Sequence, residues 1–259
     1  MKRYSQVSTE IGEMSHLPFW KRAEKKDLIY VSYGLFIAFA VLVSYILGAF
    51  NLLPHNPQEM DFSLLLTSPG TGGHLLGTDF MGRDILARLI VGIQAYFLPG
   101  LIAIAIALLL GALFGVLAGY WGGHWDTGIT YFSNLVDSFP RLVLILLMIA
   151  AFKPDIYYIM IVVGFLNVPV VVSLIKGKIQ FLKQKNFIEA ATALGLKNRV
   201  IILKHILWHN CGSLLIIQAT IGMAEVILIE TSLSYLGFGV QEPIPSWGNM
   251  LQSGHQLFH

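Results

Sequence analysis

Charged residues are scarce in this sequence, and long apolar runs take their place. Asp, Glu, Lys and Arg make up 12% of the 259 residues, whereas hydrophobic residues make up 55%. Because soluble domains carry about 25% charged residues, this composition indicates an integral membrane protein. The net charge of +2 is too small to indicate a nucleic-acid-binding protein.

Cysteine is nearly absent, and so are the sequence signatures of catalysis. The single Cys211 excludes an intrachain disulfide and a multi-cysteine metal site. No G-x-x-x-x-G-K-[ST], H-E-x-x-H or G-x-S-x-G sequence occurs, so nothing indicates a nucleotide site or an enzyme. His205 and His209 lie four residues apart, as do His255 and His259, but we predict no metal site from this spacing alone.

Apolar runs of membrane-spanning length occur five times. A spanning helix needs about 20 mainly apolar residues. The matching segments are residues 28–50, 92–118, 129–152, 156–175 and 211–231. The first run is too long for the apolar part of a cleavable signal peptide, which has about 7–15 residues, so we expect it to be retained. The predicted fold class is an all-α integral membrane protein, a polytopic helical bundle.

Lys and Arg gather on one side of the predicted spans. Six lie in residues 1–27 and seven in residues 176–210, against Arg83, Arg88 and Lys153 on the opposite side. Because cytoplasmic loops are enriched in Lys and Arg, we expect the N-terminus and the 176–210 loop to be cytoplasmic. The external segments are then 51–91 and the tail 232–259, and the transmembrane core is 92–231.

The predicted outer loop ends in an interfacial helix. Residues 78–93 carry an apolar stripe at helical spacing, with Thr78 or Asp79 as the cap. Asp84 and Arg88 lie four residues apart on another face, where they can pair. This helix either only lies at the membrane interface or also contacts an external partner.

Glycine recurs at every fourth position of the second predicted span. Gly111, Gly115 and Gly119 remove side chains from one face of the helix. Another helix backbone can then approach closely. We therefore expect these glycines to form a tight helix–helix contact.

Residues 186–207 form a basic, amphipathic segment in the predicted cytoplasmic loop. Gly195 interrupts it, because glycine tolerates the backbone angles that end a helix, and two short helices joined there form an elbow. The small Ala190 and Ala191 let another protein approach the backbone, and Glu189 offers a directed charge. The tip of the elbow is predicted at Lys197, Asn198 and Arg199. A basic loop that binds anionic lipid fits these residues equally well.

Polar residues within the apolar spans are candidates for a transport pathway or gate, because such groups are costly in lipid. They are Asp137, Arg141, Asn167, Gln218 and Glu225. Asp137 and Arg141 can instead form an internal ion pair on a continuous helix, unless Pro140 bends it. Glu225 has no partner one helical turn away, so its partner lies on another helix, on a second subunit or in water. We expect Glu230 to be solvated near the outer surface.

Three segments carry a resemblance to a known family. Residues 74–84 read His-Leu-Leu-Gly-Thr-Asp-Phe-Met-Gly-Arg-Asp, and residues 233–251 contain Leu-Gly-Phe-Gly followed by Pro-Ile-Pro-Ser-Trp-Gly-Asn-Met-Leu. Glu189-Ala190-Ala191 with Gly195 forms the third segment. These resemble the HxLGTDxxGRD segment, the LSFLGxGxxPPxPxWGxML segment and the EAA loop of permease subunits of ABC importers for dipeptides, oligopeptides and nickel.

The resemblance implies a bacterial inner-membrane, multi-pass permease of the type I ABC importer kind. A second homologous permease subunit completes the pore, and two cytoplasmic ATPase subunits hold ATP and Mg and bind the EAA loops. An extracytoplasmic solute-binding protein delivers the cargo, which is a peptide, a nickel complex or a related small solute. The chain itself is expected to bind no cofactor.

Two features depart from the family pattern. Trp208 follows Leu207 where the family commonly has proline. A sixth span usually follows the Trp-Gly motif. Either that span has been lost from this sequence, which is the alternative we expect, or this version functions without it. The alternative function is an ion-coupled secondary transporter or channel that uses Asp137 and Glu225. Five spans without inverted halves argue against that alternative.

Overall fold

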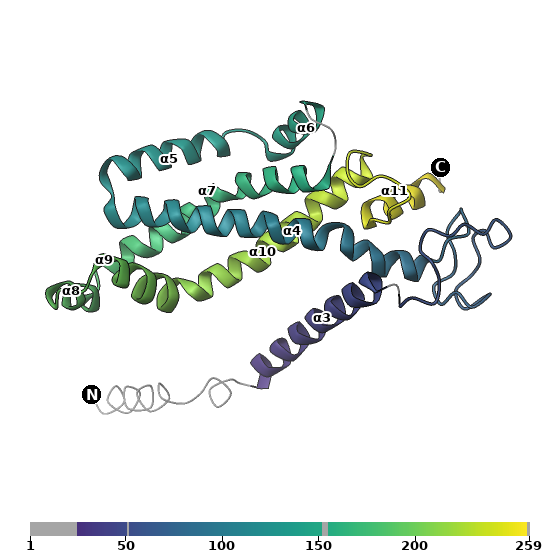
Figure 1. Ribbon diagram of the computed structural model, residues 1–259, viewed down its shortest axis with the longest axis horizontal. Coiled ribbons are helices and arrows are strands. Elements are labelled where there is room, and N and C mark those ends of the chain that lie inside the picture. The colour runs from purple at the N-terminus through teal and green to yellow at the C-terminus, as the bar shows by residue number, and fades with distance from the viewer. Residues whose placement is uncertain (1–24, 51, 152–154, 258–259) are drawn as a thin grey trace. The chain divides into compact units, whose positions relative to one another are not determined.

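The computed structural model describes residues 25–50, 52–151 and 155–257 (Figure 1). The regular elements of these residues are all helices, which confirms the predicted fold class. The chain divides into two compact units, Met1–Leu52 and Leu53–His259. Residues 1–24 and Lys153, which entered the prediction of orientation, lie outside the described residues.

The described part of the first unit is helix α3 (Lys25–Ala49). It coincides with the first predicted span. Its stretch Ile29–Ala49 is long and apolar enough to cross a membrane.

The second unit contains three further helical segments long and apolar enough to span a membrane, with shorter helices between them. Its elements are α4 (Ile85–Val116), η1 (Leu117–Trp121), α5 (Gly123–Asp137), α6 (Arg141–Ala151), α7 (Ile156–Lys183), α8 (Asn186–Ala193), α9 (Asn198–Val200), η2 (Ile201–Cys211), α10 (Gly212–Tyr235) and α11 (Trp247–Leu257). The wider π-type turns η1 and η2 continue their neighbours, so Ile85–Trp121 and Asn198–Tyr235 each form one long segment.

The predicted interfacial helix at residues 78–93 is not a separate element. Helix α4 begins at Ile85 and runs without a break through the second span. Its cap is Asp84, whose Oδ1 accepts a hydrogen bond from the Ala87 N–H at 2.6 Å. The residues of the apolar stripe from Ile85 onward therefore belong to the same continuous helix as the second predicted span.

The third predicted span is broken. Helices α5 and α6 meet at an angle of 80°. The break falls at Ser138–Pro140, because proline lacks an N–H and disfavours helical geometry in the residue before it. Arg141 then starts a new helix instead of lying one turn after Asp137.

Helices α4 and α7 are in very close contact along the glycine stripe (Gly111, Gly115 and Gly119). A Cβ built on these residues would lie 2.4 Å from the Val171 Cβ, 2.7 Å from the Ile175 Cβ and 3.0 Å from the Ile179 Cβ. Only hydrogen at these positions allows the two backbones to come this near. Residue numbers increase in the same direction along both helices at these contacts, so α4 and α7 run parallel.

The parallel arrangement determines how often the chain crosses the bilayer. Two consecutive spans joined by a short loop would be antiparallel. Since α7 runs in the same direction as α4, the bent pair α5–α6 brings the chain back from the end of η1 to the start of α7 (Figure 1). Counted as one span, the bent pair raises the number of candidate membrane spans among the described residues from four to five.

Helix α10 packs antiparallel to α4. A Cβ on Gly100 would lie 2.8 Å from the Val226 Cγ1, and one on Gly222 would lie 3.7 Å from the Ile104 Cγ1. The C-terminal tail contains a helix, α11, that packs on α10. A Cβ on Gly248 would lie 2.5 Å from a backbone oxygen of α10. Together α4, α7 and α10 form the centre of the bundle.

We predict that Gly115→Ala destabilises the protein. The new methyl group would meet the side chain of Ile175 and the carbonyl oxygen of Val172 at 3.1 Å, and such overpacking costs about 1–3 kcal/mol. Gly128→Ala is the matched control, because its Cβ would have no atom within 4 Å. The midpoint of thermal unfolding in detergent should fall for Gly115→Ala only. Equal midpoints for the two variants would contradict the packing described here.

Candidate functional site

The loop before α4 is built around Asp79. Its carboxylate accepts hydrogen bonds from the backbone N–H groups of Met81 and Arg83, at 2.8 and 3.0 Å, and pairs with the Arg83 Nε at 2.7 Å. Gly82 completes the turn with a φ of 75°, and a Cβ there would lie 1.8 Å from the Asp61 carbonyl oxygen. These contacts explain why the segment has Asp79, Gly82 and Arg83 at this spacing.

Arg83 and Arg88 are buried charges whose counter-ion comes from a distant part of the chain. Their side chains are 2% and 1% exposed. Glu242, between α10 and α11, accepts hydrogen bonds from Arg83 Nη1 at 2.8 Å and from Arg88 Nη2 at 3.0 Å. The expected pairing of Arg88 with Asp84 is therefore wrong, because Asp84 caps α4 and contacts His74. We call Asp79, Arg83, Arg88 and Glu242 the outer ion-pair cluster.

Trp247 adds a second contact between the segment that follows α10 and the start of α4. Its Nε1 donates a hydrogen bond to the Leu89 carbonyl oxygen at 3.0 Å. Gly92 makes room for the indole, since a Cβ there would lie 2.9 Å from the Trp247 Cδ1. The ring of Tyr96 meets the indole edge-on at 4.9 Å between centroids. The two outer motifs of the sequence, residues 74–84 and 233–251, thus meet at the start of α4.

A polar cluster joins α6, α7 and α10 within the predicted spans. Arg141 Nη1 donates a hydrogen bond to Asn167 Oδ1 at 3.0 Å and forms an ion pair with Glu225 Oε2 at 3.5 Å. Asn167 is buried, whereas Arg141 and Glu225 are partly exposed. Three of the polar residues singled out in the sequence therefore meet, and the expected partner of Glu225 on another helix is Arg141.

The other two intramembrane candidates have different places. Gln218 lines a narrow cavity together with Asn167, between α4, α7 and α10. Asp137 is exposed at the end of α5. No pair between Asp137 and Arg141 is found among the described residues, because the break before Arg141 removes the helical spacing on which that expectation rested.

The turn at Gly195 ends α8 with a defined hydrogen-bond pattern. The Gly195 N–H donates to the Thr192 carbonyl oxygen at 3.0 Å, and the Leu196 N–H donates to the Ala191 carbonyl oxygen at 3.1 Å. Gly195 has a φ of 73°. This is a Schellman motif, in which glycine takes the left-handed position after the helix. The expected interruption at Gly195 is confirmed.

Helix α8 has a buried face and an exposed face. Ile188 and Ala191 are buried against a core formed with α7 and η2. Glu189, Ala190 and Leu194 are exposed, and 82% of Leu194 is accessible. Ala191, expected at the surface presented to a partner, instead anchors the elbow. The open surface of α8 and its cap thus includes the acidic Glu189 and the apolar Ala190 and Leu194.

The tip of the elbow is tied to the end of the α4 segment. The Tyr120 hydroxyl donates a hydrogen bond to the Asn198 Oδ1 at 3.0 Å. Lys183 Nζ donates to the Tyr120 carbonyl oxygen at 2.8 Å. Lys197 and Arg199 flank Asn198 and are exposed. The elbow is thus held at a fixed place relative to α4 and α7.

Sequence reasoning missed two acidic residues. Glu230, expected to be solvated, is fully buried in α10 and accepts a hydrogen bond from the Ser234 hydroxyl at 2.5 Å. The position of Ser234, one helical turn after Glu230, could have indicated this hydrogen bond from the sequence. Glu242 was not singled out, although Arg83 and Arg88 on the same predicted side required a counter-ion.

Comparison with known proteins identifies the family. A family model described as "Binding-protein-dependent transport system inner membrane component" matches residues 111–257. The oligopeptide transport system permease protein OppC of Haemophilus influenzae is 33% identical, over 84% of this chain and 70% of its own. The probable D,D-dipeptide transport system permease protein DdpC of Escherichia coli is 34% identical, over 78% and 67%. The glutathione transport system permease protein GsiD of Salmonella typhimurium is 34% identical, over 90% and 76%.

The chain belongs to this family of ABC importer permeases. The resemblance to this family is thereby confirmed, as is the expectation of a transport subunit and not an enzyme. The permease is a multi-pass component of the inner membrane, and its family operates with a binding protein and an ATPase.

We predict that the Arg141–Glu225 pair tolerates exchange of its charges. Arg141→Glu and Glu225→Arg should each lower the midpoint of thermal unfolding, because each places like charges together within the permease. The double variant should recover most of the lost thermal stability. The Asn167 amide can turn so that its N–H group donates a hydrogen bond to the new carboxylate at position 141 instead of accepting one. The expected coupling energy is about 0.5–3 kcal/mol. Additive losses in the double variant would show that the two side chains do not interact.

Proposed function

We propose that this permease imports peptides or related small solutes at the expense of ATP hydrolysed by separate subunits. Two cytoplasmic ATPase subunits bind ATP and Mg, a second homologous permease subunit completes the pore, and an extracytoplasmic solute-binding protein supplies the cargo. The relatives named above transport oligopeptides, D,D-dipeptides and glutathione. These three names support a peptide-like cargo and give no support for nickel complexes.

The observation that carries this proposal is the exposed face of α8. Glu189, Ala190 and Leu194 project from a helix whose opposite face is packed on α7 and η2. An exposed leucine beside a small residue fits a groove on another protein. A force applied to α8 is passed directly to α7, and through the glycine stripe to α4. Together with Gly195 and the tip residues Lys197, Asn198 and Arg199, this face is the proposed ATPase-coupling surface.

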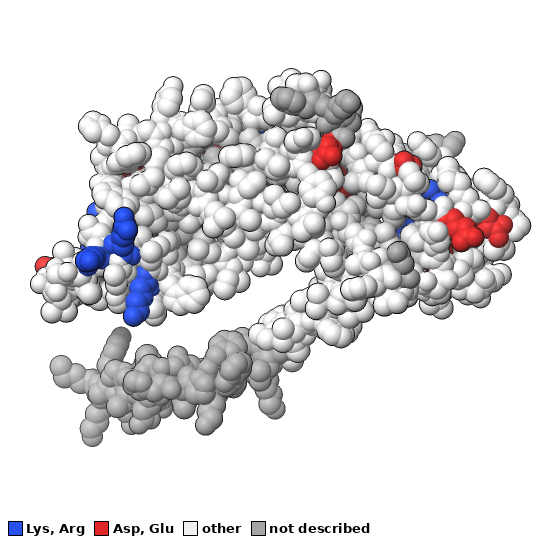
Figure 2. All heavy atoms as spheres, in the orientation of Figure 1, with Lys and Arg blue, Asp and Glu red and all other residues white. Residues whose placement is uncertain are grey.

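The distribution of charge supports a cytoplasmic location for α8. The largest group of Lys and Arg in this view lies around α8 and α9, whereas the largest group of Asp and Glu lies near the loop before α4 (Figure 2). Residues 176–210 hold seven Lys and Arg, and Lys176 alone among the described ones forms an ion pair, with Asp126. Arg83 and Arg88 at the other end are neutralised in the outer ion-pair cluster. Unpaired positive charge is typical of cytoplasmic loops, and the N-terminus is then cytoplasmic as well.

The polar cluster is the proposed gate of the pathway. Arg141, Asn167 and Glu225 connect α6, α7 and α10, and Gln218 lines the adjacent cavity. Movement of α7 against α10 would separate Asn167 and Arg141 from Glu225. Charged and amide groups at this depth suit a cargo with peptide bonds and ionised ends.

Two substitutions in the elbow test the coupling. Gly195→Ala should distort the turn, because an L-residue at this positive φ costs about 1–2 kcal/mol, and Glu189→Ala removes the exposed charge. Each should weaken association with the ATPase, by about tenfold for every 1.4 kcal/mol of binding free energy that is lost. ATP-driven uptake in proteoliposomes should fall accordingly. Insertion of the permease into the membrane should not change.

Gly177→Ala provides the matched control, since it lies on α7 and its Cβ would have no atom within 4 Å. It should leave uptake unchanged. Full ATP-driven uptake by both elbow variants would contradict the proposed coupling. Uptake driven by an ion gradient in vesicles without ATP would favour the secondary transporter instead.

A further inference from the structure

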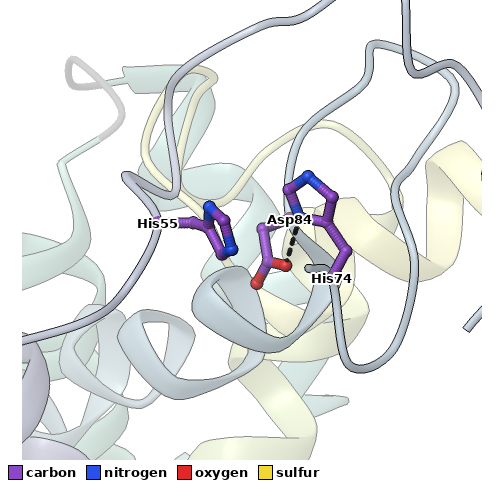
Figure 3. A group of neighbouring side chains, drawn as sticks. All are labelled: His55, His74 and Asp84. Carbon is purple, nitrogen blue, oxygen red and sulfur yellow. Dashed lines mark hydrogen bonds and ion pairs between the residues drawn. The ribbon is translucent and has the colours of Figure 1, made fainter. Parts of the chain in front are cut away.

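Two histidines and an aspartate converge at the start of α4. His55 and His74 come from the outer loop, and Asp84 is the residue that caps α4. One potential ligand atom of each lies within 4.8 Å of the other two. Figure 3 shows the two imidazole rings beside the Asp84 carboxylate. This grouping has no part in the outer ion-pair cluster or in the coupling elbow.

The geometry leaves ligand atoms available. Asp84 Oδ1 is used by the Ala87 N–H, whereas Asp84 Oδ2 faces the His74 Nδ1 at 2.7 Å. The rings of His55 and His74 lie 4.3 Å apart between centroids, tilted by 33°. His74 and Asp84 are buried, and His55 is half-buried. A small cavity lined by His55 and Asp84 adjoins the group.

We propose that His55, His74 and Asp84 bind one divalent transition-metal ion of the zinc class. Two imidazole nitrogens and one carboxylate oxygen form a donor set that such ions take readily. Calcium and magnesium prefer sites made of oxygen ligands alone. Three protein ligands leave one position of a tetrahedral ion open, and water from the adjoining cavity fills it.

Binding of the ion needs only local movement. Ligand atoms about 2.0–2.1 Å from a tetrahedral ion are about 3.4 Å apart, so His74 Nδ1 and Asp84 Oδ2 must separate slightly. The proton they share is displaced by the metal, as occurs when histidine becomes a ligand. His55 must approach by more than an ångström, and it lies in an irregular loop that can adjust.

The consequence of the site is a cross-link between the outer loop and α4. His55 and His74 lie on either side of residues 56–73 of the loop, and Asp84 fixes both to the first turn of the helix. A metal that binds only the folded arrangement stabilises it. The ion would therefore hold the external surface of the permease in one conformation.

Zinc titration of the full-length permease tests this inference. The protein is purified in detergent without a histidine tag, stripped with chelator and titrated with Zn²⁺ in competition with a chromophoric chelator. The parent is the His205→Ala/His209→Ala variant, which removes the stacked imidazole pair of η2 as a competing site. We expect one equivalent of Zn²⁺ to bind the parent and to raise its thermal midpoint, and neither Ca²⁺ nor Mg²⁺ to do so.

Two variants locate the site. His55→Ala should weaken Zn²⁺ binding by at least about tenfold. Loss of a residue that only supports a metal ligand already weakens binding by about 10–100-fold, and His55 is proposed as a direct ligand. It leaves the His74–Asp84 contact and the helix cap in place and removes only the exposed contact of His55 Nε2 with the Gly73 carbonyl oxygen at 3.3 Å and the ring contact with His74, so the metal-free variant should unfold close to the parent's midpoint. Asp84→Asn keeps the cap, because asparagine is an equally good cap, and should weaken binding likewise.

The inference fails if the parent binds no Zn²⁺, or if both variants bind it as tightly as the parent. Equal stabilisation by Ca²⁺ would also overturn it, because the donor set would then not determine which ion binds. If His55→Ala does not fold, Asp84→Asn decides the question. None of these results depends on ATP or on cargo, so failure here is distinguishable from failure of the proposed transport function.

Discussion

The close contact between the glycine stripe of α4 and helix α7 is the constraint on which the other features of the structure depend. Because the two backbones meet in parallel register, the bent pair α5–α6 must return the chain from the end of η1 to the start of α7. That return places Arg141 at the start of α6, opposite Asn167 of α7 and Glu225 of α10. The same contact continues beyond the stripe into the core that holds Ile188 of α8.

The two ends of the bundle are built for different purposes. At the end that carries the loop before α4, the buried Arg83 and Arg88 are paired with Asp79 and Glu242, and this pairing locks that loop to the segment after α10. Near α8, Lys176 alone among the described Lys and Arg of residues 176–210 forms an ion pair, and α8 exposes an apolar face. The proposed passive gate, moved from the cytoplasm, requires this combination of a rigid end and an open end.

Features that depend on neighbouring residues could be predicted from the sequence, whereas contacts between distant segments could not. The glycine spacing and the turn at Gly195 follow from local rules for helix packing and helix ends. The ion-pair partner of Arg88 could not be predicted from such rules, because Glu242 is 154 positions away. Ala191 was assigned to the wrong face, since a short helix with apolar residues on both sides does not reveal which side the bundle covers.

The central proposal is that a separate ATPase binds α8. Its most direct test is a site-specific cross-link from Ala190→Cys in membrane vesicles that contain the whole importer. Ala190 is exposed, and the native Cys211 is buried, so the introduced thiol is the reactive one. A maleimide that carries a photoreactive benzophenone should, after illumination, join the permease to the ATPase, with a yield that changes when ATP is added. An introduced thiol that is accessible to maleimide but never captures the ATPase, with or without ATP, would contradict the account.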